Sequence, residues 1–162
     1  MITENELTFF AMRRASPSDV PQLVAMMDEF HAEFGYPLNH QHATEAFATL
    51  LADDRLGCVW FIQADGQDVG YVVLTLCYSM ECGGAIAIVD DLFIRLPFRR
   101  AGLATAALAE VRAFCVRGGV RAIHVETGRD NAAALSVYRQ AGFRDDDRQH
   151  LTLRLANLTH EG

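Results

Sequence analysis

Nowhere does this sequence of 162 residues carry an apolar run long enough to cross a membrane, since a span needs about 20 consecutive apolar residues. Its first ten residues, MITENELTFF, lack the basic segment and apolar core of a signal peptide, so we expect a cytoplasmic protein with no membrane partner. Cysteine is also scarce: there are four, and none belongs to a Cys-x-x-Cys pair. We therefore expect reduced, mostly buried thiols and no metal site.

Basic residues are in deficit. The chain has 14 Lys and Arg against 21 Asp and Glu, a formal net charge of −7, which argues against a nucleic-acid partner. The acidic excess would steer a cationic small substrate toward the protein, although solubility alone accounts for it equally well. Repeats, linkers and low-complexity segments are missing too. With 51% hydrophobic and 22% charged residues, the sequence predicts one globular domain over residues 1–162.

Hydrophobic periodicity defines the order of the elements. Alternating or continuously apolar segments predict strands at residues 9–15, 57–64, 69–78, 85–94, 120–127 and 150–155. Helical spacing predicts helices from Ser16 to the Gly35-Tyr36-Pro37 stop, and over residues 41–52, 103–117 and 130–141. The order β-α-α-β-β-β-α-β-α-β has hairpins first and crossovers later. It predicts an α/β fold: a mixed, mostly antiparallel, twisted sheet with helices on both faces.

A basic loop connects the predicted strand 85–94 to the predicted helix 103–117. Pro97 ends the strand, and the run Arg99-Arg100-Ala101-Gly102-Leu103-Ala104 leads into the helix. A helix N-terminus exposes unpaired N–H groups, and Gly102 allows close backbone approach, so this loop is typical of a pyrophosphate cradle. It is neither a Walker A loop nor a dinucleotide fingerprint, which need Gly-Lys-Ser/Thr or three glycines. Taken alone, it fits an ordinary basic loop equally well.

A second run decides between these interpretations. Asn131, Ala134, Tyr138, Gly142 and Phe143 follow the pattern Asn-x-x-Ala-x-x-x-Tyr-x-x-x-Gly-Phe. This pattern and the preceding Arg-x-x-Gly-x-Ala run resemble, in the same order, the signatures of the GNAT N-acetyltransferases. The predicted element order is similar to that superfamily over nearly the whole chain. The resemblance implies an enzyme that moves the acetyl group of acetyl-CoA, its cosubstrate, to a primary amine.

The same resemblance assigns roles to residues of the two runs. The pantetheine arm would pair with the backbone of the central strand, and the pyrophosphate would lie on the loop and helix start. The cofactor-binding residues are then Leu92, Phe93, Ile94, Arg99, Arg100, Ala101, Gly102, Leu103, Ala104, Thr105, Asn131 and Ala134. A backbone N–H near Leu92 would stabilise the oxyanion. Tyr138 would protonate the leaving thiolate; its alternative is a core aromatic. Asn131 would hydrogen-bond the CoA arm; its alternative is a helix N-cap, and the two roles are compatible.

Two adjacent carboxylates precede these strand residues. The segment 89–94, with Asp90 and Asp91, resembles the acidic strand of diamine acetyltransferases. An alkyl amine has a pKa near ~10 and must lose a proton to attack. We expect Asp90 to act as the base, through water, and Asp91 to hold the substrate ammonium. Because successive strand residues face opposite ways, both can serve only if the strand has a bulge. His124 and Glu126 are reserve bases.

The acceptor is expected between the first two helices and the hairpin of strands 69–78 and 85–94. Exposed-looking candidates there are Glu33, Phe34, Tyr36, Tyr78 and Met80, each of which could instead be plain packing. The predicted function is acetyl transfer to a small, cationic amine by direct attack in a ternary complex. Alternatives are a peptide or protein N-terminal or lysine acetyltransferase, or a non-catalytic acyl-CoA-binding module. A homodimer is a candidate assembly, and the hairpins disfavour a dehydrogenase-like nucleotide-binding fold.

Overall fold

The computed structural model describes residues 8–155, which form one five-stranded sheet in the order β1-β2-β3-β4-β5. The strands are β1 (Phe10–Arg14), β2 (Gly57–Ala64), β3 (Gln67–Ser79), β4 (Gly84–Ile94) and β5 (Ile123–Val125). Neighbouring strands are antiparallel from β1 to β4, and only β4 and β5 are parallel. This confirms the mixed, mostly antiparallel fold that the hairpin signals predict.

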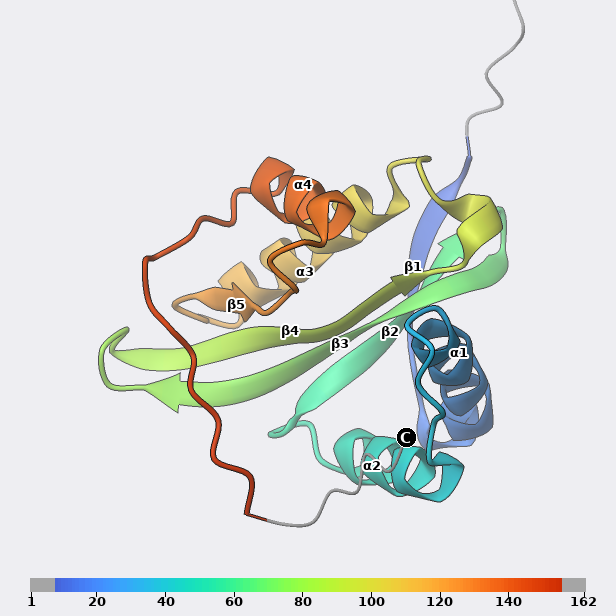
Figure 1. Cartoon of the computed structure of the whole chain (residues 1–162), viewed down its shortest axis with the longest axis horizontal. Coiled ribbons are helices and arrows are strands. Elements are labelled where there is room, and N and C mark those ends of the chain that lie inside the picture. Colours follow the sequence, from blue (N-terminus) through green and yellow to red (C-terminus); the bar gives the residue numbers. More distant parts are fainter. Residues whose placement is uncertain (1–7, 156–162) are drawn as a thin grey trace, which may run out of the picture.

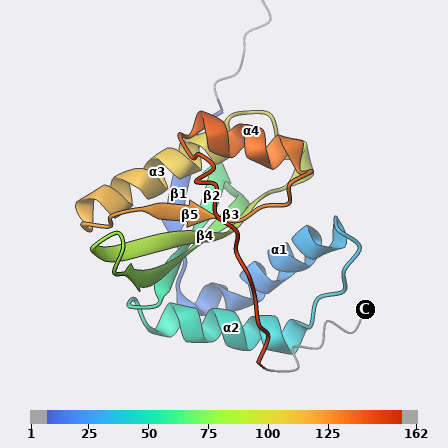
Figure 2. The same ribbon diagram turned by 60° about the vertical axis from the view of Figure 1, so that its left-hand side comes forward.

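The helices cover both faces of this sheet. α1 (Val20–Ala32) and α2 (His40–Ala52) lie on one face, and α3 (Leu103–Arg117) and α4 (Ala132–Gln140) lie on the other (Figures 1 and 2). Local signals set their ends. Ser16 and Asp19 form a capping box at the 3-10 turn that precedes α1, and the Asn39 side chain accepts a hydrogen bond from the His42 N–H at the start of α2.

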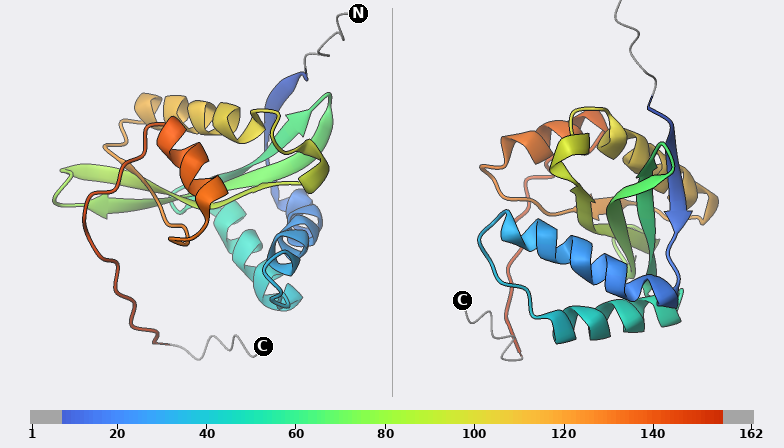
Figure 3. Two further views of the ribbon diagram at one scale, coloured as in Figure 1. Left: turned by 45° about the horizontal axis from the view of Figure 1, so that its top comes forward. Right: turned by 90° about the vertical axis from the view of Figure 1, so that its right-hand side faces the viewer.

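Each layer of helices has its own apolar core. The α3/α4 side is mostly aliphatic, and its buried residues include Ile62, Val72, Leu74, Val89 and Val111. The α1/α2 side is richer in aromatic residues; it buries Leu23, Met26, Phe47, Phe61, Tyr71 and Phe93. Figure 3 shows the two layers edge-on, with the sheet between them. Alternate residues of β2 and β3 feed the two cores, as the pleat of a strand requires.

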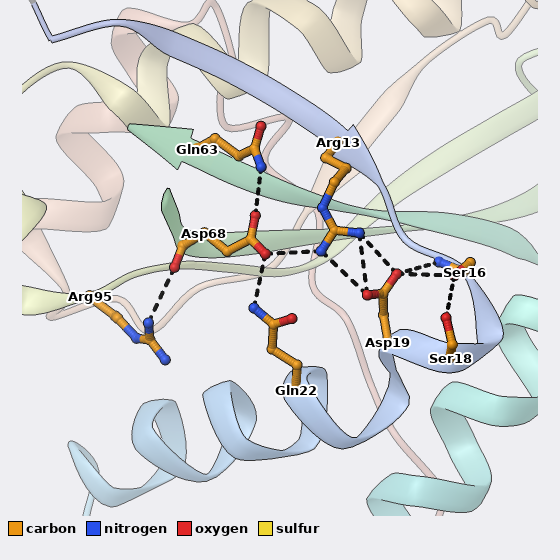
Figure 4. A network of polar contacts seen from close by, with 8 residues as sticks. All are labelled: Arg13, Ser16, Ser18, Asp19, Gln22, Gln63, Asp68 and Arg95. Atoms are coloured by element: carbon orange, nitrogen blue, oxygen red, sulfur yellow. Dashed lines mark hydrogen bonds and ion pairs between the residues drawn. The ribbon is translucent and has the colours of Figure 1, made fainter. Parts of the chain in front are cut away.

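A polar network closes the edge of the sheet beside α1 (Figure 4). The Arg13 guanidinium donates to Asp68 Oδ2 at 2.9 Å and to Asp19 Oδ2 at 3.1 Å. Asp68 also accepts from Gln22 at 2.9 Å and from Gln63 at 2.8 Å. The network therefore joins β1, the start of α1 and the β2–β3 hairpin, and every carboxylate in it faces a donor.

The sequence prediction is wrong at the C-terminal side. Residues 150–155 alternate like a strand but form none, because the chain there pairs with no neighbour in the described part of the molecule. The predicted strand 120–127 shrinks to Ile123–Val125, since β4 offers it only Ala87, Ile88 and Val89 as partners. The expectation of mostly buried thiols holds for two of the four cysteines: Cys58 and Cys115 are buried, whereas Cys77 and Cys82 are exposed.

Within residues 8–155, none of the helices combines the length and apolar character that a membrane span requires. The same residues hold no group of three or more His, Cys, Asp and Glu side chains placed to bind a metal ion.

Candidate active site

The site is organised by an irregularity in β4. Val89 pairs with Leu74 and Asp91 pairs with Val73, so Asp90 has no partner on β3 and forms a β-bulge. The extra residue reverses the alternation. Val89 faces the α3/α4 core, but Asp91 and Phe93 face the α1/α2 side, while Leu92 and Ile94 return to the α3/α4 side. Pairing with β5 also stops at Val89, so within residues 8–155 one edge of β4 has no partner strand from the bulge onward.

Asp91 accepts a hydrogen bond from a buried tyrosine. The Tyr71 hydroxyl, in a side chain with no solvent exposure, donates to Asp91 Oδ2 at 3.1 Å. Burial raises the pKa of the Asp91 carboxyl and the neighbouring charge of Asp90 raises it further, against the opposing effects of Tyr71 and His31. No salt bridge to Asp91 occurs within residues 8–155, so its negative charge is left without a cationic partner.

Asp90 projects from the bulge into solvent-accessible space. The pKa of its carboxyl is raised, first by lost hydration and then by the negative charge of Glu126. Glu126 follows β5 and pairs with His150 Nδ1 at 2.9 Å, while His124 is exposed on β5 itself. The expected base and one of its reserves thus share one region. A carboxyl with a raised pKa is suited to accept a proton near neutrality.

Tyr138, on α4, is influenced by the charge of Asp91 on β4. It lies on α4, partly buried, with its ring edge-on to Phe143 at 5.6 Å between centroids. Burial raises the pKa of its phenol, and the Asp91 charge raises it further. The hydroxyl therefore stays protonated at neutral pH and is available as a proton donor. The aspartates belong to β4 and Tyr138 to α4; the Asp90 charge acts on Asp91, and the Asp91 charge acts on Tyr138.

The start of α3 presents an anion-binding geometry. Gly102 is the N-cap residue, at φ 77°, and Arg100 also has positive φ, at 63°. No side chain caps the helix, so the N–H groups of its first turn point outward. A Cβ built on Gly102 would meet no atom within 4 Å, which shows open space in front of these groups. The arrangement fits the phosphates of a cofactor with the helix dipole behind them.

Arg99 has a different position from the one expected of a phosphate ligand. Its Nε donates to the Ile94 carbonyl oxygen at 2.7 Å, and its guanidinium pairs with Glu33 and lies over the Phe93 ring. Arg99 therefore joins the loop to the end of α1. The Ile94 carbonyl is already used, and the Phe93 side chain is buried on the α1/α2 side. Only the backbone of Phe93 remains for a cofactor. Both arginines of the loop are exposed, but only Arg100 makes no salt bridge within residues 8–155.

Asn131 caps α4, as one of its two expected roles requires. Its Oδ1 accepts from the Ala134 N–H at 3.2 Å. The side-chain oxygen is engaged, which leaves the amide nitrogen to donate to a cofactor. The cofactor candidates thus lie at the starts of α3 and α4 and along β4 between them, and they remain predictions.

The acceptor candidates fall into two separate groups. Phe34 and Tyr36 are exposed after α1, and Phe34 contacts Phe30, whose ring in turn contacts Phe93. Tyr78 and Met80 are exposed at the tip of the β3–β4 hairpin, where Tyr78 pairs with Ala85. Asp91 lies six positions after Ala85, roughly 20 Å along a strand. The structure does not bring the two groups together around one point.

Sequence reasoning missed two residues beside Asp91. Tyr71 sits in a continuously apolar strand, where nothing marks it as polar support, and His31 lies on α1 close enough to lower the pKa of Asp91. A buried tyrosine needs a partner for its hydroxyl, and that was the available signal. Without knowing of the bulge, however, Asp91 would be assigned to the opposite face from Tyr71.

Comparison with known proteins identifies the family. The model described as the Acetyltransferase (GNAT) family matches residues 23–143, which include the β4 bulge, the α3 loop and α4. The chain belongs to the GNAT family of acetyltransferases. As a GNAT protein it is an acyltransferase, of a family that uses acetyl-CoA.

One curated protein and two solved structures illustrate what this GNAT chain is similar to. YhfO of Bacillus subtilis (strain 168), described as an uncharacterized N-acetyltransferase, is 22% identical over 135 residues, covering 83% of this chain and 90% of that protein. The crystal structure of integron cassette protein HFX_CASS3, from the mobile metagenome of Cole Harbour Salt Marsh, is 44% identical, with TM-score 0.84 over 93% of both chains. Aminoglycoside N-acetyltransferase AAC(6')-Iy, in complex with CoA, shares the fold: 16% identity, TM-score 0.76, covering 96% of this chain and all of that one.

Proposed function

We propose that this protein transfers the acetyl group of acetyl-CoA to a primary amine of a small cationic acceptor by direct attack in a ternary complex. The observation that carries the proposal is the β4 bulge. It sets Asp90 and Asp91 at the point where β4 loses its β5 partner, and the Asp91 charge acts on Tyr138. This arrangement supports the roles proposed for the three residues: Tyr138 as the acid, Asp90 as the base and Asp91 as the carboxylate that binds the acceptor.

The geometry at the start of α3 supports the proposal that acetyl-CoA is the cosubstrate. The open first turn of α3, with Gly102 in a left-handed conformation, would hold the pyrophosphate, helped by the exposed Arg100. The free edge of β4 would accept the extended arm as an added strand, with Asn131 donating from the start of α4. Acetyl-CoA would supply an acetyl group activated as a thioester.

The two proton transfers would be made by different residues, Asp90 and Tyr138. Asp90, with a raised pKa, would take a proton from the acceptor ammonium, directly or through one water. Tyr138, whose raised pKa keeps its proton in place, would donate to the departing sulfur. An acid and a base whose environments hold them in opposite protonation states are what this transfer needs.

The charge of the site favours a cationic acceptor. Asp90 and Asp91 lie side by side, and neither makes a salt bridge within the described residues. An ammonium group would relieve their repulsion, whereas an anionic acceptor would add to it. The neighbour AAC(6')-Iy is named for aminoglycosides, which are small and carry several amines. An acceptor with a second positive charge beside the reacting amine is therefore expected.

The test is a screen for release of the free CoA thiol from acetyl-CoA with polyamines, aminoglycosides, amino acids and peptides. We expect the highest kcat/KM with diamines or polyamines, and a clear deficit with a monoamine of equal length. Asp91→Asn should raise KM for the dication more than it lowers kcat, because it removes ground-state binding. Turnover restricted to peptides, or equal rates on monoamine and diamine, would contradict the acceptor proposal.

Cofactor binding is tested separately by thermal melts. Acetyl-CoA at a hundredfold excess over its Kd should add roughly 2.7 kcal/mol of stability. Gly102→Asp should abolish that increment, since it puts a carboxylate where phosphate would lie. Gly66→Asp is the matched control, because Gly66 has nearly the same φ, 80° against 77°, and equally open surroundings in the turn between β2 and β3. An unchanged increment in Gly102→Asp, or none in the wild type, would contradict the assignment.

A further inference from the structure

One hydroxyl is buried in the otherwise apolar α1/α2 core. Among the buried residues of that core within residues 8–155, only Tyr71 has a side chain with an oxygen or nitrogen atom. Its ring packs edge-on against Phe47 of α2, with 6.2 Å between centroids, and lies 6.0 Å from the Phe93 ring. A phenylalanine would fill the same space, and a buried hydroxyl costs free energy unless it makes a hydrogen bond. Packing alone therefore does not account for this hydroxyl.

The partner of the Tyr71 hydroxyl is Asp91. Tyr71 pairs with Phe93 and Val73 pairs with Asp91, so Asp91 lies diagonally across from Tyr71 on the same face of the sheet. The hydroxyl donates to Asp91 Oδ2 at 3.1 Å. Burial raises the pKa of the Tyr71 phenol, which keeps its proton in this hydrogen bond. A residue without solvent exposure is thus connected to the predicted acceptor site through one carboxylate.

This hydrogen bond holds one oxygen of Asp91 and leaves the other for a ligand. Oδ2 accepts from Tyr71, and no hydrogen bond from residues 8–155 reaches Oδ1. The Asp91 side chain is only partly buried, so a small molecule has access to it. An ammonium group carries three donors and binds a carboxylate oxygen as a point charge. Because the aromatic side chain that holds Oδ2 is itself fixed by packing, Oδ1 is oriented before the acceptor binds.

The hydrogen bond also favours the charged form of Asp91. Burial and the Asp90 charge raise the pKa of the Asp91 carboxyl, whereas Tyr71 and the charge of His31 on α1 lower it. The phenol of Tyr138 on α4 is influenced by the Asp91 charge in turn. Without the Tyr71 hydroxyl, Asp91 would stay protonated to a higher pH, and a neutral carboxyl offers an ammonium group no opposite charge.

We propose that Tyr71 is a positioning residue for acceptor specificity: its hydroxyl orients Asp91 so that Oδ1 binds the second ammonium group of a dicationic acceptor. The inference rests on the proposed acetyl transfer and adds to it a residue that touches neither the acceptor nor acetyl-CoA. Tyr71 acts only through Asp91, which binds the acceptor before the reaction. Its effect should therefore be found in KM for a dication and be small in kcat.

The test compares a diamine with a monoamine of equal length in the thiol-release assay. Tyr71→Phe should raise KM for the diamine about tenfold, near the lower limit for a lost hydrogen bond to a charged group. KM for the monoamine and kcat for both amines should stay within about twofold of wild type. In an Asp91→Asn background, Tyr71→Phe should change the diamine KM no further, since the two residues act as one unit.

Phe47→Leu is the matched control, because it removes an aromatic contact from the Tyr71 ring and keeps the hydroxyl. It should lower the melting temperature and keep the preference for the diamine. The acetyl-CoA melting increment should be unchanged in Tyr71→Phe and in Phe47→Leu, which shows that both variants are folded and bind the cosubstrate.

The pH dependence of KM gives a second measurement that a purely structural tyrosine would not change. KM for the diamine should rise in acid as Asp91 takes up a proton. In Tyr71→Phe this rise should begin at a higher pH, because the hydroxyl no longer stabilises the charged carboxylate. The charge of His31 also acts on Asp91, so the two profiles are measured again in a His31→Gln background, where the same shift should persist.

The outcomes separate this inference from the proposed function. A wild type that prefers the diamine, with the same preference and the same pH profile in Tyr71→Phe, would leave the acetyl transfer standing and make Tyr71 a core residue only. An equal loss of preference in Phe47→Leu would also overturn the inference, since loosening of the core would then explain both variants. Equal wild-type rates on the two amines would overturn the acceptor proposal and the role of Tyr71 together.

Discussion

Two pairs of aspartates in this protein have opposite environments. Asp19 and Asp68 surround Arg13, and hydrogen bonds satisfy both (Figure 4). The Ser16 backbone N–H and then Arg13 lower the pKa of Asp19; for Asp68, burial alone would raise the pKa, but Arg13, Gln63 and Gln22 outweigh it. Asp90 and Asp91 make no salt bridge within residues 8–155, and their pKa values are raised.

The difference separates a structural use of carboxylates from a functional one. The Arg13 network joins three segments, and its charges are neutralised within the fold. The β4 pair keeps its charge uncompensated, at a cost in stability, where a ligand or a proton can compensate it. Raised carboxyl pKa values at an opening are typical of functional sites, whereas the lowered ones stabilise the fold above the ordinary pKa of Asp. Substitutions at the two sites should therefore have opposite consequences.

The largest effect is expected at Tyr138, which senses the Asp91 charge. Tyr138→Phe should lower kcat by a factor of about 100 to 10,000, the usual range for a lost general acid, and keep the acetyl-CoA melting increment. Asp68→Asn, in the structural pair, should leave kcat within about twofold of wild type. The kcat of each variant is measured from the steady-state release of the CoA thiol between pH 6 and 10. Wild-type kcat in Tyr138→Phe at every pH would make Tyr138 a core aromatic only.

A smaller effect, on stability, is expected from Arg13→Ala. It removes the cation shared by Asp19 and Asp68 and a stacking contact with Phe61, and should lower the free energy of unfolding by about 2 kcal/mol. Arg55→Ala is the control, since Arg55 pairs with Asp53 at an exposed position and should change stability far less than Arg13→Ala does. Urea unfolding at neutral pH measures the two. Equal losses would mean that the network adds nothing beyond a surface ion pair.

The smallest effect concerns the pH dependence of stability at Asp91. Because its folded pKa is raised, ionised Asp91 destabilises the fold, so Asp91→Asn should increase the free energy of unfolding at pH 7. The gain should vanish as pH falls toward the ordinary Asp pKa, about 3.9. Asp68→Asn should show the reverse: a loss at pH 7 that disappears in acid, since the folded pKa of Asp68 is lowered. The same sign for both variants would remove the distinction between the pairs.

Local signals were sufficient for much of the fold. The bounds of β2 and α3 are those that the apolar patterns and flanking glycines predict, and Gly102 has the left-handed conformation that the loop requires. These features depend on neighbours in sequence, where propensity and capping act. The two GNAT-like runs also located the starts of α3 and α4, where the cofactor candidates lie.

The remaining features depend on distant partners. The bulge at Asp90 exists only in the register between β3 and β4, and the Tyr71–Asp91 hydrogen bond follows from it. The ion pair of Arg99 with Glu33 joins residues that are 66 apart, so the loop motif alone could not reveal it. Residues 150–155 form no strand, although their sequence alternates, because a strand also needs an edge to pair with.

The bulge also has a consequence for how this sheet tolerates insertions and deletions. Asp90 is the one residue of β4 between Gly84 and Ile94 without a partner on β3, so a chain lacking it could pair Val89 and Asp91 consecutively with Leu74 and Val73. Every other side chain would then keep the face that it has now. Deletion of the single residue Asp90 would therefore turn β4 into a regular strand, paired with β3 without a bulge.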